Sequence, residues 1–571
     1  MKTKHIYYIS LFTLIIYSIY KATLGVHGDE LHTIAMGDMI ASGNSFFIES
    51  WFYLQLSAVI NAPIIYVYKL IVGDLTGIVL FLRIVSIIIQ LMISFYFYLT
   101  FREDFDEKYV MLASILFFIY IPDFRNMIYK VELMWFTLLL ILFIYRYYKT
   151  FKCRYLILSG ISVALCTLCY PPSGISVFFV SFLLYVFNRD DKKQLMRSII
   201  ILIGTCGICA VLFMTYIFAT IGIKQFIEFF PRLLSDENIT GNLYSKLIHP
   251  VIKIMAFFLL SYVPIVMVGK LKFVNKLFSN MRFPLVSALY LGAFLCQTFV
   301  ERACITWHII TYPYALSLAV CAILVHRCNN EQYKKTFWIF EIMCISVVIS
   351  MTIASNQGNI SCTMGMIFAT LLLVIWPQDA NYNEPAAIIL KEKKILNYVI
   401  LIISLFAFLF PVYEWETTNC TPISQCSVFT EREKAEYGPM KGVSLGYSFA
   451  PKYKKMYSIV NEYVHEKDKL CIIDDGLGIA SVGYMCKNIV YSTYSPQGGS
   501  QIGLSEKLNE YFTLNPSRIA NVFIINEDFI NISLDDYLVN TKIGKYIATN
   551  KYEIISCGNG YYVCLKNIED K

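Results

Sequence analysis

Charged side chains are scarce in this sequence. Lys, Arg, Asp and Glu together make up 16% of the 571 residues, whereas 57% are hydrophobic, and the mean hydropathy is +0.57. This balance excludes an ordinary soluble enzyme and indicates a membrane protein with many spanning helices. The formal net charge of +7 is small for this length, and basic loops at a membrane account for it better than nucleic-acid binding does.

The polar C-terminal part of the chain lacks the cysteine and histidine spacing of a zinc site. Six cysteines lie there: Cys420, Cys426, Cys471, Cys486, Cys557 and Cys564. An even number outside the cell is compatible with disulfides, for which Cys420–Cys426 and Cys557–Cys564 are the candidate pairs, or with buried free thiols. At the other end of the chain, no small-residue cleavage site follows the first apolar run, so we expect an uncleaved first helix.

Thirteen apolar stretches qualify as membrane spans. They cover residues 6–24, 76–101, 109–121, 131–145, 155–170, 174–188, 198–220, 251–268, 283–300, 309–325, 336–354, 362–376 and 395–413. Residues 51–73 are also apolar, but Gln55, Asn61, Pro63 and Lys69 interrupt them. We therefore predict an all-α transmembrane domain over residues 1–413.

The distribution of basic residues decides whether residues 51–73 cross the membrane. If they do not, and the N-terminus is cytoplasmic, the predicted cytoplasmic segments carry 22 Lys and Arg residues, whereas the external loops between residues 75 and 414 carry six. This asymmetry follows the positive-inside rule, and one more span would reverse it. Residues 25–75 are thus predicted to form one external loop with helices on the membrane surface, and the odd number of spans places residues 414–571 outside.

Residues 414–571 are polar and long enough for one domain. Helices are expected near 452–467, 505–514 and 534–546, and strands near 470–473, 488–492, 520–525, 552–556 and 561–565. The Gly558-Asn559-Gly560 sequence between the last two strands is typical of a hairpin turn. Together these elements predict a small extracytoplasmic α/β domain.

The most unusual polar stretch directly follows the first helix and reads Gly25-Val26-His27-Gly28-Asp29-Glu30-Leu31-His32. Carboxylates are costly near hydrocarbon and tend to mark function there. The two glycines permit a sharp turn that aims Asp29 at the membrane face. The alternative is that Asp29 and Glu30 only cap the following helix. The ligand types His27, Asp29 and His32 suggest a metal, but their spacing fits no standard site, so no metal is predicted.

Further polar residues share the predicted outer face with Asp29. Asp123 ends the third span at a similar depth, so the two carboxylates are expected to converge. Cations on this face are candidates for binding a phosphate leaving group, the alternative being that each is solvated or paired; they are His27, Arg125, Lys130, Arg232, Lys246, Arg302 and His308. Arg83 lies inside the second span, where it has to pair with an external carboxylate or reach the interface.

With these features the chain resembles the glycosyltransferase C superfamily of membrane enzymes: one helix, a long first external loop with Asp29-Glu30, a series of spans, and an external C-terminal domain. Within it, the chain is similar to bacterial protein mannosyltransferases and aminoarabinose transferases. The resemblance implies Asp29 and Glu30 as the catalytic acidic pair of the first loop and Asp123 as their partner. No Trp-Trp-Asp triplet occurs, which argues against an oligosaccharyltransferase.

The resemblance also implies a reaction. A hexose or pentose would pass from a polyprenyl-phosphate donor to a hydroxyl group of an envelope glycan, lipid or protein, with inversion and without a cofactor. Three other functions stay open. A flippase or transporter predicts charges inside spans and inverted repeats, a glycan polymerase predicts a large late external loop, and a non-enzymatic envelope protein leaves the placement of Asp29 and Asp123 unexplained.

Overall fold

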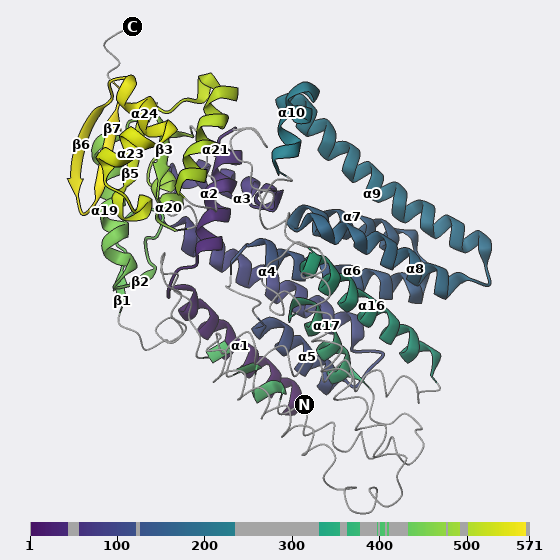
Figure 1. Ribbon diagram of the computed structural model, residues 1–571. Coiled ribbons are helices and arrows are strands. Elements are labelled where there is room, and N and C mark those ends of the chain that lie inside the picture. The colour runs from purple at the N-terminus through teal and green to yellow at the C-terminus, as the bar shows by residue number, and fades with distance from the viewer. Residues whose placement is uncertain are drawn as a thin grey trace, which may run out of the picture.

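The computed structural model describes residues 2–43, 56–120, 126–233, 330–353, 363–376 and 432–566, apart from gaps at 467, 475–477 and 492–500, together with scattered helical residues between 397 and 409. Figure 1 shows a part built of helices and, at one end of it, a smaller domain with a sheet, drawn in green to yellow. The predicted spans 251–268, 283–300 and 309–325 lie outside the described residues.

The helical part follows the predicted apolar stretches closely. Its elements are α1 (Lys2–Ala22), α2 (Gly28–Ala41), α3 (Ala58–Val72), α4 (Ile78–Phe101), α5 (Glu107–Ile119), α6 (Tyr129–Thr150), α7 (Cys153–Cys169), the 3-10 turn η2 (Pro171–Ile175), α8 (Ser176–Asn188), α9 (Lys192–Ile221), α10 (Ile223–Leu233), α16 (Glu331–Ile353) and α17 (Thr363–Ile375). Among the described residues, five helical stretches are long and apolar enough to cross a membrane: α4, α6, η2 with α8, α9 and α16.

The ambiguous stretch 51–73 contains α3, a 15-residue apolar helix with Pro63 in its second turn. One face of α3 leaves Tyr66, Leu70 and Ile71 exposed. Lys69, which interrupts the apolar pattern, pairs with Asp38 of α2 at 2.8 Å and donates a hydrogen bond to Ser42. An apolar exposed face and a polar face tied to α2 agree with a helix that lies on the membrane surface.

The C-terminal domain is a mixed α/β sandwich, as its pattern of strands and helices predicts. The strands β3 (Lys469–Ile473), β4 (Val490–Tyr491), β5 (Val522–Asn526), β6 (Glu553–Gly558) and β7 (Tyr561–Leu565) form one sheet in the order β4-β3-β5-β7-β6. β3 is parallel to β4 and β5, whereas β7 is antiparallel to β5 and β6. The predicted hairpin at Gly558–Gly560 is confirmed, and all three of its residues have positive φ.

Helices cover both faces of this sheet. They are α19 (Phe449–Tyr463), α20 (Ile479–Met485), α21 (Gln501–Leu514), α22 (Glu527–Ile530), α23 (Leu534–Asn540) and α24 (Lys542–Thr549), with a 3-10 turn η4 (Pro516–Arg518). Alternate residues of β3 face different cores: Leu470 and Ile472 belong to the core shared with the transmembrane helices, and Cys471 and Ile473 to a separate one. Because successive side chains of β3 point to opposite faces and both faces are buried, the strand is a continuous apolar run.

The cysteines of this domain that the structure describes are free thiols. Cys564 pairs in register with Ile554 rather than with Cys557, and its side chain lies in the second core. Burial raises the pKa of the Cys564 thiol to about 12, so it stays protonated and unreactive at neutral pH. The disulfide alternative for Cys557–Cys564 is therefore wrong, and the Cys420–Cys426 pair lies outside the described residues.

Candidate functional site

The turn between α1 and α2 brings the first acidic residues into place. Gly25 has φ of +65°, a conformation that a glycine adopts without strain. Gly28, by contrast, is the first residue of α2, so only one of the two glycines serves the turn. The N-cap of α2 is His27, without a side-chain capping bond, and Asp29 and Glu30 lie in the first helical turn. Neither Asp29 nor Glu30 is therefore the N-cap that the alternative interpretation of this stretch requires.

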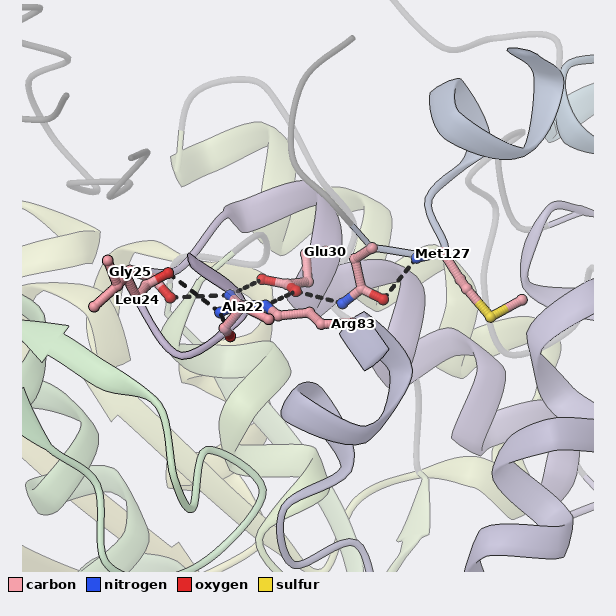
Figure 2. A network of polar contacts seen from close by, with 7 residues as sticks. Ala22, Leu24, Gly25, Glu30, Arg83 and Met127 are labelled. Atoms are coloured by element: carbon pink, nitrogen blue, oxygen red, sulfur yellow. Dashed lines mark hydrogen bonds and ion pairs between the residues drawn. The ribbon is translucent and has the colours of Figure 1, made fainter. Parts of the chain in front are cut away.

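Glu30 is held by Arg83 of α4 in a fully buried ion pair (Figure 2). The Nε and Nη2 atoms of Arg83 lie 2.6 Å from Oε1 and Oε2 of Glu30, respectively, and neither side chain is exposed. Asn126 donates a further hydrogen bond to Glu30 Oε1. The predicted pairing of Arg83 with an external carboxylate is confirmed. Because both oxygens of Glu30 are occupied, we assign this residue to the support of the turn rather than to contact with substrate.

The same guanidinium fixes the backbone in front of α2. Arg83 donates hydrogen bonds to the carbonyl oxygens of Ala22 at 2.8 Å, Leu24 at 3.2 Å and Gly25 at 2.9 Å. Five donor contacts therefore leave this one side chain, which matches the number of N–H groups that a guanidinium carries. The turn that carries Asp29 is rigid for this reason.

Residues of the C-terminal domain hold the other side of that turn. Two short strands, β1 (Arg432–Lys434) and β2 (Ser444–Gly446), pair with each other, and Ser444 also pairs with the turn. Gly25 N donates to Ser444 O at 2.9 Å, and Ser444 N donates to Thr23 O at 2.7 Å. The N-terminal end of α4 bonds to the same segment, through Gly77 N to Gly438 O at 3.0 Å. The C-terminal domain is thus hydrogen-bonded directly to the acidic loop.

Asp29 points to a different partner. Its Oδ2 lies 3.3 Å from Nζ of Lys130, in the first turn of α6. The Asp29 side chain is 23% exposed and the Lys130 side chain 5%, and the ammonium of Lys130 also lies 5.4 Å from the centre of the Tyr129 ring. Two residues that are remote in sequence therefore form one charged pair with a partly accessible carboxylate. Both were predicted site residues.

The remaining predicted site residues are only partly visible. Asp123 and Arg125 lie outside the described residues, in the segment that ends directly before Asn126. Lys246, Arg302 and His308 also lie outside them, and Arg232 is in the last turn of α10 without a described side chain. His27 is buried beside the turn. In the described part of the chain, His, Cys, Asp and Glu residues form no group of three that could bind a metal.

Two residues of this region were not singled out from the sequence. Asn126 binds the Glu30 carboxylate through its amide and caps the backbone N–H of Met127 through its Oδ1. Ser444 acts only through its backbone, which leaves no signature in the choice of side chain. The Asn126 amide was recognisable at most as one more polar residue on the outer face.

Comparison with known families shows which proteins this chain is similar to. Residues 63–218 match the family described as dolichyl-phosphate-mannose-protein mannosyltransferase. The chain resembles the protein mannosyltransferases. The matched residues run through most of α3 to most of α9 and contain Arg83, Asn126 and Lys130, while Asp29 and Glu30 precede them. Comparison with curated proteins gave no match.

Two kinds of solved structure are similar over nearly the whole chain. ArnT from Cupriavidus metallidurans, bound to undecaprenyl phosphate, is 10% identical with a TM-score of 0.49, and the alignment covers 99% of this chain and 98% of that one. The oligosaccharyltransferase AglB from Archaeoglobus fulgidus, with an inhibitory peptide and a dolichol-phosphate, is 11% identical with a TM-score of 0.40, covering 98% and 74%. The apo form of the A. fulgidus oligosaccharyltransferase gives 9% identity and 0.41.

Proposed function

We propose that the protein is a membrane glycosyltransferase that transfers a sugar from a polyprenyl-phosphate donor to an acceptor hydroxyl group. The observation that carries this proposal is the Asp29–Lys130 pair, in which Lys130 belongs to the residues that match a family named for dolichyl-phosphate mannose. A carboxylate and an ammonium side by side supply the two charges that such a transfer requires, one for the proton and one for the phosphate.

The roles of the two groups follow from their chemistry. Lys130 binds the donor phosphate, since an ammonium forms strong charge-assisted hydrogen bonds with phosphate oxygens. Once the phosphate takes Lys130, the carboxylate of Asp29 is released to accept the proton of the acceptor hydroxyl. The acceptor oxygen then forms a bond to the anomeric carbon while the bond from that carbon to the phosphate oxygen breaks. Polyprenyl phosphate leaves, and the configuration inverts because the attack comes from the opposite side.

Residues outside this pair complete the proposal. Asp123 positions the acceptor beside Asp29, since it precedes by three residues Asn126, which donates a hydrogen bond to Glu30. The outer-face cations His27, Arg125, Arg232, Lys246, Arg302 and His308 add to the binding of the donor phosphate, with Arg302 the first choice. The acceptor is a glycan, lipid or protein of the cell envelope, and the proposed reaction uses no cofactor.

We propose that the sugar transfer takes place on the outer face of the cytoplasmic membrane. The asymmetry of 22 basic residues against six supports a cytoplasmic N-terminus and external residues 414–571. We expect alkaline phosphatase fused after residue 571 to be active in cells, and a fluorescent protein at the same position to be exported and dark. Fluorescence from the C-terminal fusion would reverse the topology and move Asp29 to the cytoplasmic face.

Transfer by purified protein tests the function directly. Wild type in detergent is given polyprenyl-phosphate sugars and an envelope extract, and transfer of labelled sugar is counted. Lys130→Met should weaken donor binding by about 10- to 100-fold, since a hydrogen bond to a charged group is lost. Lys69→Met is the matched control, because Lys69 forms the other lysine–aspartate pair on α2, with Asp38.

The control should leave donor affinity unchanged. Equal donor affinity in wild type and Lys130→Met would remove Lys130 from the phosphate site. Absence of transfer by wild type with every polyprenyl-phosphate sugar would favour the flippase, polymerase or non-enzymatic alternatives.

A further inference from the structure

A groove lies along the first half of α1, at the opposite end of this helix from the acidic turn. Its volume is about 480 Å³, within the range of about 300–1,000 Å³ that is usual for ligand sites. The groove is lined by α1 between Ile6 and Leu14, by α5, and by Leu401 and Leu405 of the span predicted at 395–413. Four residues of α5 take part, at the spacing of a single helix face: Lys108, Met111, Leu112 and Ile115.

Contacts on both sides of the groove hold its helices together. α1 and α5 lie beside each other (Figure 1), and the Tyr7 hydroxyl of α1 is 3.0 Å from the Ser114 hydroxyl of α5. Further along α1, the Tyr17 ring packs edge-on against the Phe408 ring of the last predicted span, with 5.5 Å between the ring centres. The space between these contacts is therefore a built feature of three packed segments.

The groove is apolar along its length and charged at one end. The Thr13 hydroxyl on its wall is occupied, since it donates to Ile9 O at 3.0 Å. Among the described residues that line the groove, Lys108 alone is charged, and its side chain is exposed at the start of α5. Lysines at helix ends lay their apolar stems along hydrocarbon and hold the ammonium at the interface. A ligand for this groove combines an apolar chain with an anionic group.

The carboxylates next to Lys108 in sequence have other partners. Glu107 pairs with Lys4 at 2.9 Å. Asp106 is the N-cap of α5 and accepts a hydrogen bond from the backbone N–H of Lys108 at 3.0 Å. In the part of the chain that the structure describes, the Lys108 ammonium forms no ion pair, so its charge is available to an external anion.

The length of the groove corresponds to one leaflet of the membrane. Ile6 and Leu14 are about 12 Å apart along the helix axis, and half of the hydrocarbon core is roughly 15 Å thick. Lys108 lies at the end that the excess of basic residues assigns to the cytoplasm. The cytoplasmic leaflet is the one that carries anionic phospholipids.

We infer that the groove binds an acyl chain of an anionic phospholipid from the cytoplasmic leaflet, with the headgroup at Lys108. The lipid is distinct from the proposed sugar donor, whose phosphate binds Lys130 at the other surface of the membrane. A zwitterionic headgroup fits less well, because its own cation offsets the attraction between the phosphate and Lys108. This inference is independent of sugar transfer.

Two phospholipids with identical acyl chains test the headgroup contact. Purified protein that has been washed free of lipid is titrated with phosphatidylglycerol or phosphatidylcholine, and native mass spectrometry measures the first bound molecule. Wild type should bind phosphatidylglycerol about fivefold more tightly, the gain expected for one lysine near an anionic surface. Lys108→Met should bring the two affinities to within about twofold of each other, because the cation at the groove is lost.

Lys193→Met is the matched control for the charge. Lys193 is the second residue of α9, as Lys108 is of α5, and both helices begin after an aspartate N-cap. Both lysine side chains are exposed, but Lys193 does not line the groove. The control should keep the preference of wild type for phosphatidylglycerol.

Thr13→Trp tests the groove itself. The Thr13 side chain is exposed, so the larger ring enters the groove without displacing buried residues. This variant should lose the tight first binding step for both lipids. Phe12→Trp is the control, because Phe12 is 65% exposed on the same helix and does not line the groove, and it should bind both lipids as wild type does.

Each contrary result overturns the inference. Equal affinity of wild type for the two lipids, or an unchanged preference in Lys108→Met, would exclude the headgroup contact. Unchanged binding by Thr13→Trp would show that another surface holds the lipid. Displacement of phosphatidylglycerol by polyprenyl phosphate would assign the groove to the sugar carrier instead. Because these measurements need no sugar transfer, failure of the proposed function would leave them unaffected.

Discussion

Asp29→Asn should lower the rate of sugar transfer by about 10²–10⁴-fold while the protein still inserts and binds donor. This is the range that a general base contributes, and the substitution keeps the shape of the side chain while it removes the basicity. The geometry favours a local effect, because Asp29 is partly exposed and its Lys130 partner retains an oxygen acceptor in the asparagine. Single-turnover transfer with a saturating polyprenyl-phosphate sugar is the measurement.

Asp38→Asn provides the control for this prediction. Asp38 lies on the same helix and is also paired with a lysine, Lys69, at 2.8 Å. It should retain transfer within about twofold of wild type per folded protein, because Asp38 lies nine residues, roughly 13 Å, further along α2 than Asp29. Comparable rates for Asp29→Asn and wild type would exclude Asp29 as the base, whatever the behaviour of the control.

Arg83→Met should destabilise the protein by about 3–5 kcal/mol, the usual cost of removing one partner from a buried ion pair. The substitution leaves the Glu30 carboxylate unpaired in the interior and takes the donors from the carbonyl oxygens of Ala22, Leu24 and Gly25. We expect a lower melting temperature in detergent together with loss of transfer. The melting temperature of Arg83→Lys should lie between those of wild type and Arg83→Met, since an ammonium cannot make the two-point contact with the Glu30 carboxylate.

A second substitution separates the charge from the packing. Glu30→Gln with Arg83→Met removes both charges, so the double variant should be more stable than the sum of the single effects by about 0.5–3 kcal/mol. Arg102→Met is the control on the same helix, because Arg102 is exposed at its end, and it should change stability by no more than about 0.5 kcal/mol. Additive single effects would contradict a direct pair in the folded protein.

The pairing of Arg83 is predictable in part from the sequence. A charge inside an apolar span requires a partner, and external carboxylates were the available ones. Which carboxylate it takes was not predictable, because Asp29 and Glu30 are neighbours in sequence. Only the turn at Gly25 and the start of α2 at Gly28 decide their directions: consecutive residues of a helix point about 100° apart. One residue therefore faces Arg83 and the other Lys130.

The C-terminal domain illustrates the same limit. Alternating apolar runs, polar helices and the Gly558–Gly560 turn were sufficient to predict an α/β domain. The strand order β4-β3-β5-β7-β6 depends on crossovers that no local pattern encodes. The Cys557–Cys564 disulfide was open from sequence spacing, whereas the register pairs Cys564 with Ile554. The contact of Ser444 with Thr23 and Gly25 consists of backbone hydrogen bonds, so no side-chain pattern in the sequence predicts it.

The backbone contact between Ser444 and the turn can form only late in synthesis. Gly25 and Ser444 are about 420 residues apart, and at typical translation speeds a ribosome adds the residues between them in roughly 20–80 s. During this interval Arg83 and Glu30 can already meet, but Thr23 and Gly25 have no strand beside them. A chain that stops early would insert its first helices and still lack the final two bonds of the acidic turn. The loop that carries Asp29 thus gains its last two backbone hydrogen bonds only after Ser444 has been synthesised.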